Sequence, residues 1–146
     1  MSGNGRTYLD TSALAKWYLN EPGSDDFVRY LQGLDVAVVS SLTRTEVRSM
    51  LARRRRMGEL DHELESVVNA AFLNDIAQGW LLLYPVEDAR YEEAANLIAR
   101  YPEHPLRTLD ALHLAIALQS RTDALATADS VMADAAVALD FVVVRF

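Results

Sequence analysis

At 146 residues the chain has the length of one compact domain and can bury roughly 70% of the surface that its unfolded form exposes. It contains no cysteine and only three scattered histidines, which excludes disulfides, thiolate catalysis and cysteine-rich or histidine-rich zinc sites, so a metal ion must be held mainly by oxygen. The net charge of −7, from 14 basic and 21 acidic residues, argues against a protein whose whole surface binds nucleic acid, yet it allows a local basic patch.

Short apolar runs typical of strands alternate with helical patterns along the whole chain. The strand candidates are TYL at 7–9, VAVV at 36–39, WLLLY at 80–84, ALAT at 124–127 and FVVV at 141–144. The helical patterns cover 12–19, 24–33, 43–57, 61–78, 87–100, 108–120 and 130–139. Strands that alternate with helices predict an α/β fold of three layers, in which helices cover both faces of a mainly parallel, five-stranded sheet.

Nothing in the sequence divides the chain or anchors it in a membrane. No stretch rich in Gly, Pro, Ser or Gln is long enough for a linker, so we expect a single domain over 1–146 with only residues 1–5 loose. The apolar run WLLLYPV at 80–86 is far shorter than the roughly 20 residues of a membrane span, and the N-terminus lacks the apolar core of a signal peptide. These features predict a cytoplasmic protein without a membrane segment.

Four acids are predicted to meet at one edge of the sheet. Helix N-termini and strand C-termini gather at the same edge of a parallel sheet, and open α/β folds bind their ligands there. Asp10 ends the first strand, and Glu46 lies in the first turn after the second. Asp110 lies in the first turn of the helix before the fourth strand, and Asp129 follows that strand. Their convergence from four separate segments points to a shared site.

Each of the four acids also has a simple structural explanation. Asp10 can cap the helix that follows it, and Glu46 stands three residues after Thr43, which is the spacing of a capping box. Asp110 suits the positive end of its helix, and Asp129 can be an N-cap or a turn residue. Taken singly, none of the four identifies a functional site.

Four clustered carboxylates cannot all stay charged by themselves. At an effective dielectric of about 20, two ionised carboxylates about 5 Å apart repel each other by on the order of 3 kcal/mol. The cluster must therefore bind protons or a cation, and a site made of oxygen suits Mg²⁺, with Mn²⁺ as a substitute. Such a site can hydrolyse phosphodiesters by activating water and neutralising developing charge, with either one or two ions.

Four segments resemble, in order and spacing, the acidic blocks of a known family. They are YLDTSALAKWYLNEPGS at 8–24, SSLTRTEV at 40–47, LRTLDALHLAIAL at 106–118 and ALATADSVMADAA at 124–136. Together they resemble the four blocks of PIN-domain ribonucleases, and the likeness is strongest to the VapC-type toxins of bacterial and archaeal type II toxin–antitoxin pairs. The resemblance spans almost the whole chain and implies a single-domain PIN-like fold.

This resemblance implies an Mg²⁺-dependent endoribonuclease that hydrolyses RNA. The metal-binding, catalytic acids would be Asp10, Glu46, Asp110 and Asp129. The family further implies a homodimer and a cognate protein antitoxin that occludes the site. Ser12 and the hydroxyl of Thr127 would orient a metal-bound water or a carboxylate. Asp134, about one helical turn beyond Asp129, is an alternative fourth acid, but Asp129 is preferred because it stands directly at the strand end.

Two further features each allow more than one interpretation. His113 stands three residues after Asp110 and could be a ligand or a proton shuttle, but its apolar neighbours favour a hydrogen-bonded, partly buried histidine. The run Arg53–Arg56 ends a helix, so it is either a solvated helix end or a contact for flanking RNA or a partner. At roughly 1.5 Å per residue, Arg55 lies about 14 Å along the axis from Glu46, too far to reach a phosphate held at the acids.

Two other functional classes compete with the nuclease. In a phosphatase of the haloacid-dehalogenase type, Asp10 would be the nucleophile. Such enzymes need an acid two residues later, where this chain has Ser12, and a lysine near a later strand end, where it has none. A non-catalytic module, either receiver-like with an acidic Mg²⁺ pocket or a PIN fold without activity, is the other alternative. Loss of catalysis usually removes an acid, and all four acids are present.

Overall fold

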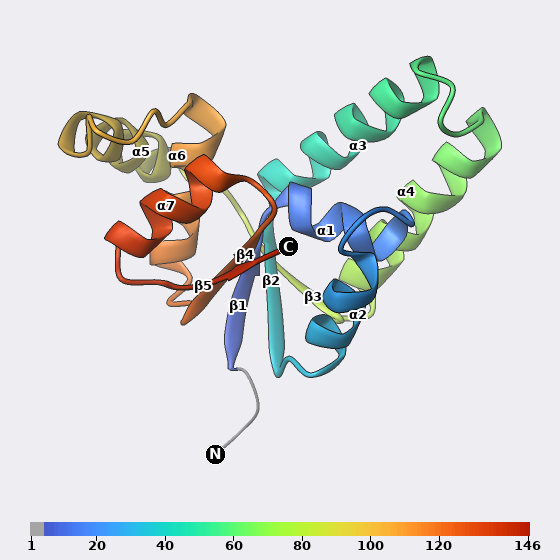
Figure 1. Cartoon of the computed structure of the whole chain (residues 1–146), viewed down its shortest axis with the longest axis horizontal. Helices are drawn as coiled ribbons and strands as arrows, with labels where there is room; N and C mark the ends of the chain where they lie inside the picture. The colour runs from blue at the N-terminus through green and yellow to red at the C-terminus, as the bar shows by residue number, and fades with distance from the viewer. Residues whose placement is uncertain (1–4) are drawn as a thin grey trace.

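The computed structural model describes residues 5–146, so the expected loose segment at 1–5 lies outside the described residues apart from Gly5. The strands are β1 (Arg6–Leu9), β2 (Val36–Ser40), β3 (Leu81–Tyr84), β4 (Ala124–Thr127) and β5 (Val142–Arg145). The helices are α1 (Thr11–Tyr18), α2 (Ser24–Gln32), α3 (Ser41–Arg56), α4 (His62–Ala77), α5 (Asp88–Arg100), α6 (Thr108–Gln119) and α7 (Ser130–Ala138) (Figure 1). Every expected strand and helix is found, with its ends shifted by at most two residues.

The five strands within residues 5–146 form one sheet in the order β3-β2-β1-β4-β5, and every neighbouring pair is parallel. Strand β1 is central, since Tyr8 pairs with Val38 of β2 on one side and with Leu125 of β4 on the other. The chain builds one half of the sheet through β2 and β3 and then returns to build the other half through β4 and β5. This reversal opens a crevice beyond the carboxyl ends of β1 and β4, where open α/β sheets bind ligands.

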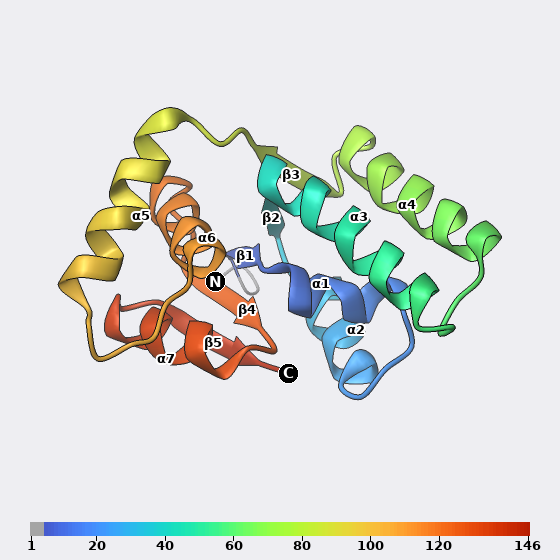
Figure 2. The same ribbon diagram turned by 90° about the horizontal axis from the view of Figure 1, so that it is seen from above.

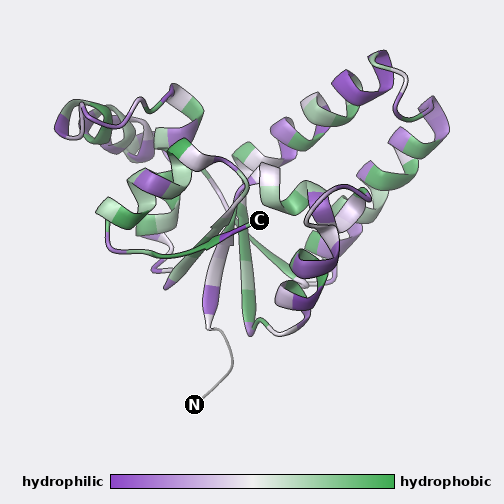
Figure 3. Ribbon diagram, viewed as in Figure 1, coloured by the Kyte–Doolittle hydropathy of each residue, from purple (hydrophilic) through white to green (hydrophobic). Residues whose placement is uncertain are grey.

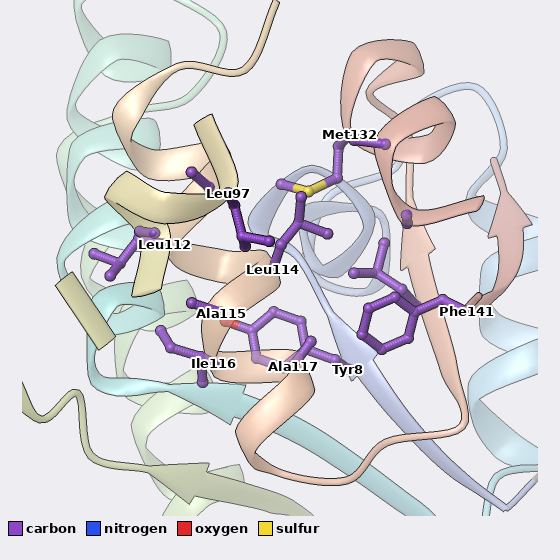
Figure 4. Packing of buried hydrophobic residues seen from close by; sticks show 14 of the residues in the cluster. Tyr8, Leu97, Leu112, Leu114, Ala115, Ile116, Ala117, Met132 and Phe141 are labelled. Carbon is purple, nitrogen blue, oxygen red and sulfur yellow. The ribbon is translucent and has the colours of Figure 1, made fainter. Parts of the chain in front are cut away.

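Helices cover both faces of the sheet, each over its own hydrophobic cluster. Figure 2 shows α1 to α4 on one side and α5 to α7 on the other. The cluster under α1 to α4 includes Leu14, Phe27, Leu51 and Phe72. The cluster under α5 to α7 includes Leu97, Leu114, Met132 and Phe141, which pack around Tyr8 of β1 (Figure 4). In Figure 3 most of the strand residues are hydrophobic, whereas hydrophobic and hydrophilic residues alternate along the helices. The three layers predicted from the sequence are confirmed.

Helix α6 lies between the sheet and α5, which explains why its sequence is apolar almost all round. Its residues from Ala111 to Ala117 are all buried. Full burial of a leucine or isoleucine side chain contributes about 1.5–3 kcal/mol to stability, so α6 is held firmly against β1 and β4. None of the helices between residues 5 and 146 has the combination of length and apolar character that a membrane crossing requires.

The start of α3 differs from the expectation and changes the position of Glu46. The helix begins at Ser41, because Thr43 Oγ1 accepts a hydrogen bond from the backbone N–H of Ser40 at 3.1 Å and so caps the helix from within. Glu46 therefore lies in the second turn of α3, one turn later than expected. The capping-box explanation for Glu46 is wrong, which leaves its carboxylate for other partners.

Candidate active site

Asp10 lies at the centre of the sheet edge, held on three sides by hydrogen bonds. Its backbone N–H continues the ladder to Ala126 of β4 at 3.1 Å, and its side chain caps α1 by accepting from the N–H of Ala13 at 2.9 Å. The hydroxyls of Ser12 and Thr127 donate to its two carboxylate oxygens at 2.7 and 2.6 Å. The side chain is only 4% exposed, so its position is set by α1 and β4 together.

Burial dominates the electrostatics of Asp10. Desolvation raises the pKa of its carboxyl, and the hydrogen bonds from Thr127, Ser12 and the Ala13 N–H, together with the nearby His113, lower that pKa only in part. The hydrogen-bonding groups around Asp10 therefore do not fully compensate its negative charge. A cation beside this carboxylate would supply the missing compensation.

Glu46 projects from α3 to the start of α1 and is held there by two donors. Its Oε1 accepts from the hydroxyl of Thr11 at 2.7 Å and from Nε2 of His113. Burial alone would raise the pKa of Glu46, but the hydrogen bond and positive potential of His113 and the hydrogen bond of Thr11 outweigh it, so the pKa is lowered. Because Thr11 directly follows Asp10 in the chain, Glu46 and Asp10 lie at the same junction.

His113 connects α6 to this junction through a buried chain of hydrogen bonds. It is 3% exposed, its Nδ1 lies 2.5 Å from the hydroxyl of Tyr8, and that hydroxyl bonds to Ser40 Oγ at 3.1 Å. An ionised carboxylate only accepts hydrogen bonds, so Nε2 must carry the proton that faces Glu46. The expected hydrogen bonding of His113 is confirmed, but the ring is almost completely buried rather than partly buried. Its contact with Glu46 was not foreseen, although the three-residue spacing from Asp110 places both side chains near one face of α6.

Asp129 is joined to Asp10 through Thr127. The backbone N–H of Asp129 donates to Thr127 Oγ1 at 2.9 Å, and the same hydroxyl donates to Asp10. The N–H of Ala128 donates to Ser12 Oγ at 3.0 Å, which ties the end of β4 to α1. The carboxylate of Asp129 caps α7 by accepting from the N–H of Val131 at 2.9 Å. The structure thus places Ser12 and Thr127 between two of the four acids.

Asp110 and Asp134 have local partners of their own. Asp110 is the third residue of α6, and its Oδ2 accepts from the backbone N–H of Arg107 at 3.2 Å. Its side chain is mostly buried and stands one turn before His113 on the same helix. Asp134 forms an ion pair with Arg145 of β5 at 2.9 Å, and its carboxylate is exposed. The carboxylate of Asp134 therefore already has a positively charged partner within the chain.

The donor set at the junction suits a hard divalent cation. Between residues 5 and 146, no three carboxylate or imidazole side chains stand close enough together to form a ready-made metal cage. The groups that do meet are oxygen donors, since Asp10 and Glu46 contribute carboxylates and Ser12 and Thr127 contribute hydroxyls. Oxygen donors favour Mg²⁺ or Mn²⁺ over softer metals, so the residues present fit such an ion chemically.

Comparisons with known proteins find relatives along almost the whole chain. The PIN domain family matches residues 7–138. Two proteins of Mycobacterium tuberculosis are similar in sequence. Ribonuclease VapC49 is 38% identical over 112 residues, which cover 76% of this chain and 74% of that protein. Ribonuclease VapC46 is 34% identical over 139 residues, which cover 94% of this chain and 95% of that protein.

Solved structures share the fold. The crystal structure of Mycobacterium tuberculosis VapC20, a sarcin-ricin loop cleaving toxin, is similar with a TM-score of 0.72 and 20% identity, over 96% of this chain and 99% of that one. A toxin–antitoxin complex from Klebsiella pneumoniae is similar with a TM-score of 0.57 and 18% identity, over 85% of this chain and 87% of the matched chain. At these sequence identities, the structural similarity shows a shared fold and nothing further.

Proposed function

The chain belongs to the PIN-domain family, with VapC ribonucleases among its relatives, and on that premise we propose that it is a metal-dependent endoribonuclease acting as the toxin of a toxin–antitoxin pair. The proposed catalytic, metal-binding acids are Asp10, Glu46, Asp110 and Asp129. The observation that carries the proposal is the junction of Asp10 and Glu46 at the crevice beyond β1 and β4, where one carboxylate is buried without full compensation and the other is held ionised.

The four acids would contribute differently to binding the ion. Asp10 presents a carboxylate whose direction is fixed by Ser12 and Thr127. Glu46 would present a second carboxylate, whose Oε1 is held by Thr11 and His113 while Oε2 would be available to the ion. Asp110 and Asp129, whose carboxylates here accept from the backbone N–H groups of Arg107 and Val131, would complete the set of acids that holds the ion. Bound Mg²⁺, or Mn²⁺ in its place, supplies Lewis acidity and a water of lowered pKa.

The family relationship also suggests the molecular partners. We propose that the substrate is RNA, that a cognate antitoxin protein covers the site, and that two copies of the chain associate. The solved toxin–antitoxin complex from Klebsiella pneumoniae supports the antitoxin partner through its shared fold. An enzyme that cuts cellular RNA acts where RNA is, so the proposed location is the cytoplasm.

RNA cleavage by the purified chain tests the proposal. We expect cleavage of a mixed single-stranded RNA with Mg²⁺ or Mn²⁺, no cleavage with EDTA, and none with Asp10→Asn or Glu46→Gln purified in the same way. Asp134→Asn is the matched control, because that carboxylate pairs with Arg145, and it should cleave like the wild type. Full activity of Asp10→Asn would contradict the proposal. A folded wild-type chain that binds the metal but leaves RNA intact would be a non-catalytic module.

A further inference from the structure

The arginine run at the end of α3 divides into two pairs with different environments. Arg54 forms ion pairs with Glu21 at 2.8 Å and Glu59 at 3.7 Å. Arg55 pairs at 2.7 Å with Glu65 of α4, whose side chain is buried. Among residues 5–146, Arg53 and Arg56 have no carboxylate in ion-pair range, and both are exposed. Arg54 and Arg55 therefore form ion pairs within the chain. The charges of Arg53 and Arg56 are available to bind another molecule.

The two unpaired arginines stand on the side of α3 that carries Glu46. Arg53 follows Glu46 by seven residues, which places it about 10 Å further along the axis and only about 20° around it. Arg56 stands about 15 Å along and about 80° around. Arg48, by contrast, is about 200° around the helix from Glu46. Figure 1 shows α3 extending away from the edge of the sheet. Arg53 and Arg56 therefore lie progressively further from the acids along this helix.

A cavity joins Glu46 to these arginines. It has a volume of about 600 Å³ and is lined at one end by Thr11, Ser12 and Glu46 and at the other by Arg53, Arg54 and Arg56. Ser49 and Met50 of α3 lie between the two ends. Lys16 and Glu21 also line the cavity, and because Glu21 is paired with Lys16 and Arg54, the arginine end keeps a net positive charge. One end of the cavity is thus anionic and suits a metal ion, and the other end is cationic and suits a phosphate.

We propose that this cavity is the path of the RNA strand, in which Arg53 and Arg56 bind backbone phosphates beyond the one held at the acids. The inference rests on the proposed nuclease function and extends it. A strand with one phosphate at the metal and further phosphates along α3 complements both ends of the cavity at once. An acidic peptide would complement only the arginine end, because Glu46 at the other end repels its carboxylates. Guanidinium groups suit phosphates through paired N–H donors.

The salt dependence of RNA binding tests the inference. The probe is a short fluorescein-labelled single-stranded RNA, bound with Ca²⁺ in place of Mg²⁺ to slow cleavage. For single strands, the slope of log affinity against log salt is about 0.7 per phosphate neutralised. Arg53→Gln and Arg56→Gln should each reduce that slope by about 0.7 and weaken binding roughly tenfold. In the double variant the slope should fall by about twice as much as in either single variant.

Arg48→Gln is the matched control, because it removes the same charge from the same helix on the other side. It should leave the slope unchanged, and neither it nor the two test variants should shift the thermal midpoint, since all three side chains are exposed. Slopes of Arg53→Gln and Arg56→Gln equal to that of Arg48→Gln would overturn the inference while cleavage still supports the nuclease. Retained RNA binding with loss of antitoxin binding would assign the surface to the protein partner. A wild type that neither binds nor cuts RNA would overturn both proposals.

Discussion

The imidazole Nε2–H of His113 on α6 donates a hydrogen bond to the carboxylate of Glu46 on α3. The contact connects helices from the two halves of the molecule across the central strand, and Tyr8 of that strand holds the other ring nitrogen at 2.5 Å. Glu46 is therefore positioned by α6, the same helix that carries Asp110. Two of the proposed metal-binding acids depend on one helix for their placement.

Removing the imidazole should weaken metal binding through Glu46. We expect His113→Ala to raise the dissociation constant for Mn²⁺, measured by electron paramagnetic resonance, by about 10–100-fold, the usual loss when a partner behind a metal ligand is removed. Cleavage should fall by a similar factor. His113→Gln, whose amide can replace the Nε2 donor, should recover much of the affinity.

The exposed His62 provides the control for this prediction. Its side chain is 83% exposed at the start of α4, and His62→Ala should leave Mn²⁺ affinity unchanged. If His113→Ala folds and binds Mn²⁺ as the wild type does, the imidazole does not position Glu46 for the ion.

Thr127 should matter through its hydroxyl rather than its bulk. Its Oγ1 donates to Asp10 and accepts from the N–H of Asp129 in a fully buried position. Thr127→Val keeps the shape but leaves that N–H unpaired, at a cost of roughly 1–3 kcal/mol. In a domain of this size, each kcal/mol lowers the thermal midpoint by about 2–4 °C. Thr127→Ser keeps the hydroxyl and should retain most of the cleavage rate, so equal losses in the two variants would refute this role.

Asp10 should reduce the stability of the metal-free protein at neutral pH. Burial raises the pKa of its carboxyl in the folded state, so its contribution to stability is fully present below the unfolded pKa and is lost as pH rises through the folded value. In EDTA at neutral pH, Asp10→Asn should therefore melt at a higher temperature than the wild type, and asparagine keeps the cap of α1. The difference should shrink as pH falls toward the unfolded pKa of an aspartate.

The difference in melting temperature between the wild type and Asp10→Asn separates the contribution of Asp10 to stability from that of Glu46. The pKa of Glu46 is lowered, so its contribution has the opposite sign and is lost as pH falls, but it is common to both proteins. Mg²⁺ should raise the melting temperature of the wild type and not that of Asp10→Asn. A lower midpoint for Asp10→Asn in EDTA at neutral pH would show that the carboxylate stabilises the metal-free fold instead.

Asp129 and Asp134 are distinguished by their partners. Asparagine caps a helix about as well as aspartate, so Asp129→Asn should keep α7 intact and lose only the charge. We expect it to raise the Mg²⁺ concentration for half-maximal cleavage by more than roughly tenfold. Asp134→Asn should not change that concentration, because Asp134 pairs with Arg145. The reverse result would make Asp134 the fourth acid.

Much of the fold could be predicted because its signals are local. β-branched and apolar runs alternate with helical patterns, and this alternation alone indicates a parallel sheet with two covered faces. The placement of Asp10 and Asp129 follows from the same topology, since Asp10 directly follows β1 and Asp129 follows the neighbouring parallel strand β4 after one residue. The sequence also shows why α6 is buried, because it is apolar almost all round.

The contacts that could not be predicted depend on packing between distant elements. The bond from His113 to Glu46 requires α6 and α3 to approach each other over β1, and no local pattern encodes that distance. The division of the arginine run has the same origin, because Arg55 is neutralised only where α4 brings Glu65 beside it. The early start of α3 cannot be predicted because either Ser40 or Thr43 can cap a helix, and only the backbone geometry decides between them.

The most direct test of the central claim is where Mn²⁺ binds, measured by paramagnetic broadening of the backbone amide signals of the ¹⁵N-labelled chain. We predict that substoichiometric Mn²⁺ first removes the signals of Thr11, Ser12, Glu46 and Ala128, and that Asp10→Asn abolishes this selective loss. Excess Mg²⁺ should restore the signals by competition. Broadening centred elsewhere, for example on the acidic start of α2 at Asp25 and Asp26, or unchanged by Asp10→Asn, would contradict a metal site at the junction of Asp10 and Glu46.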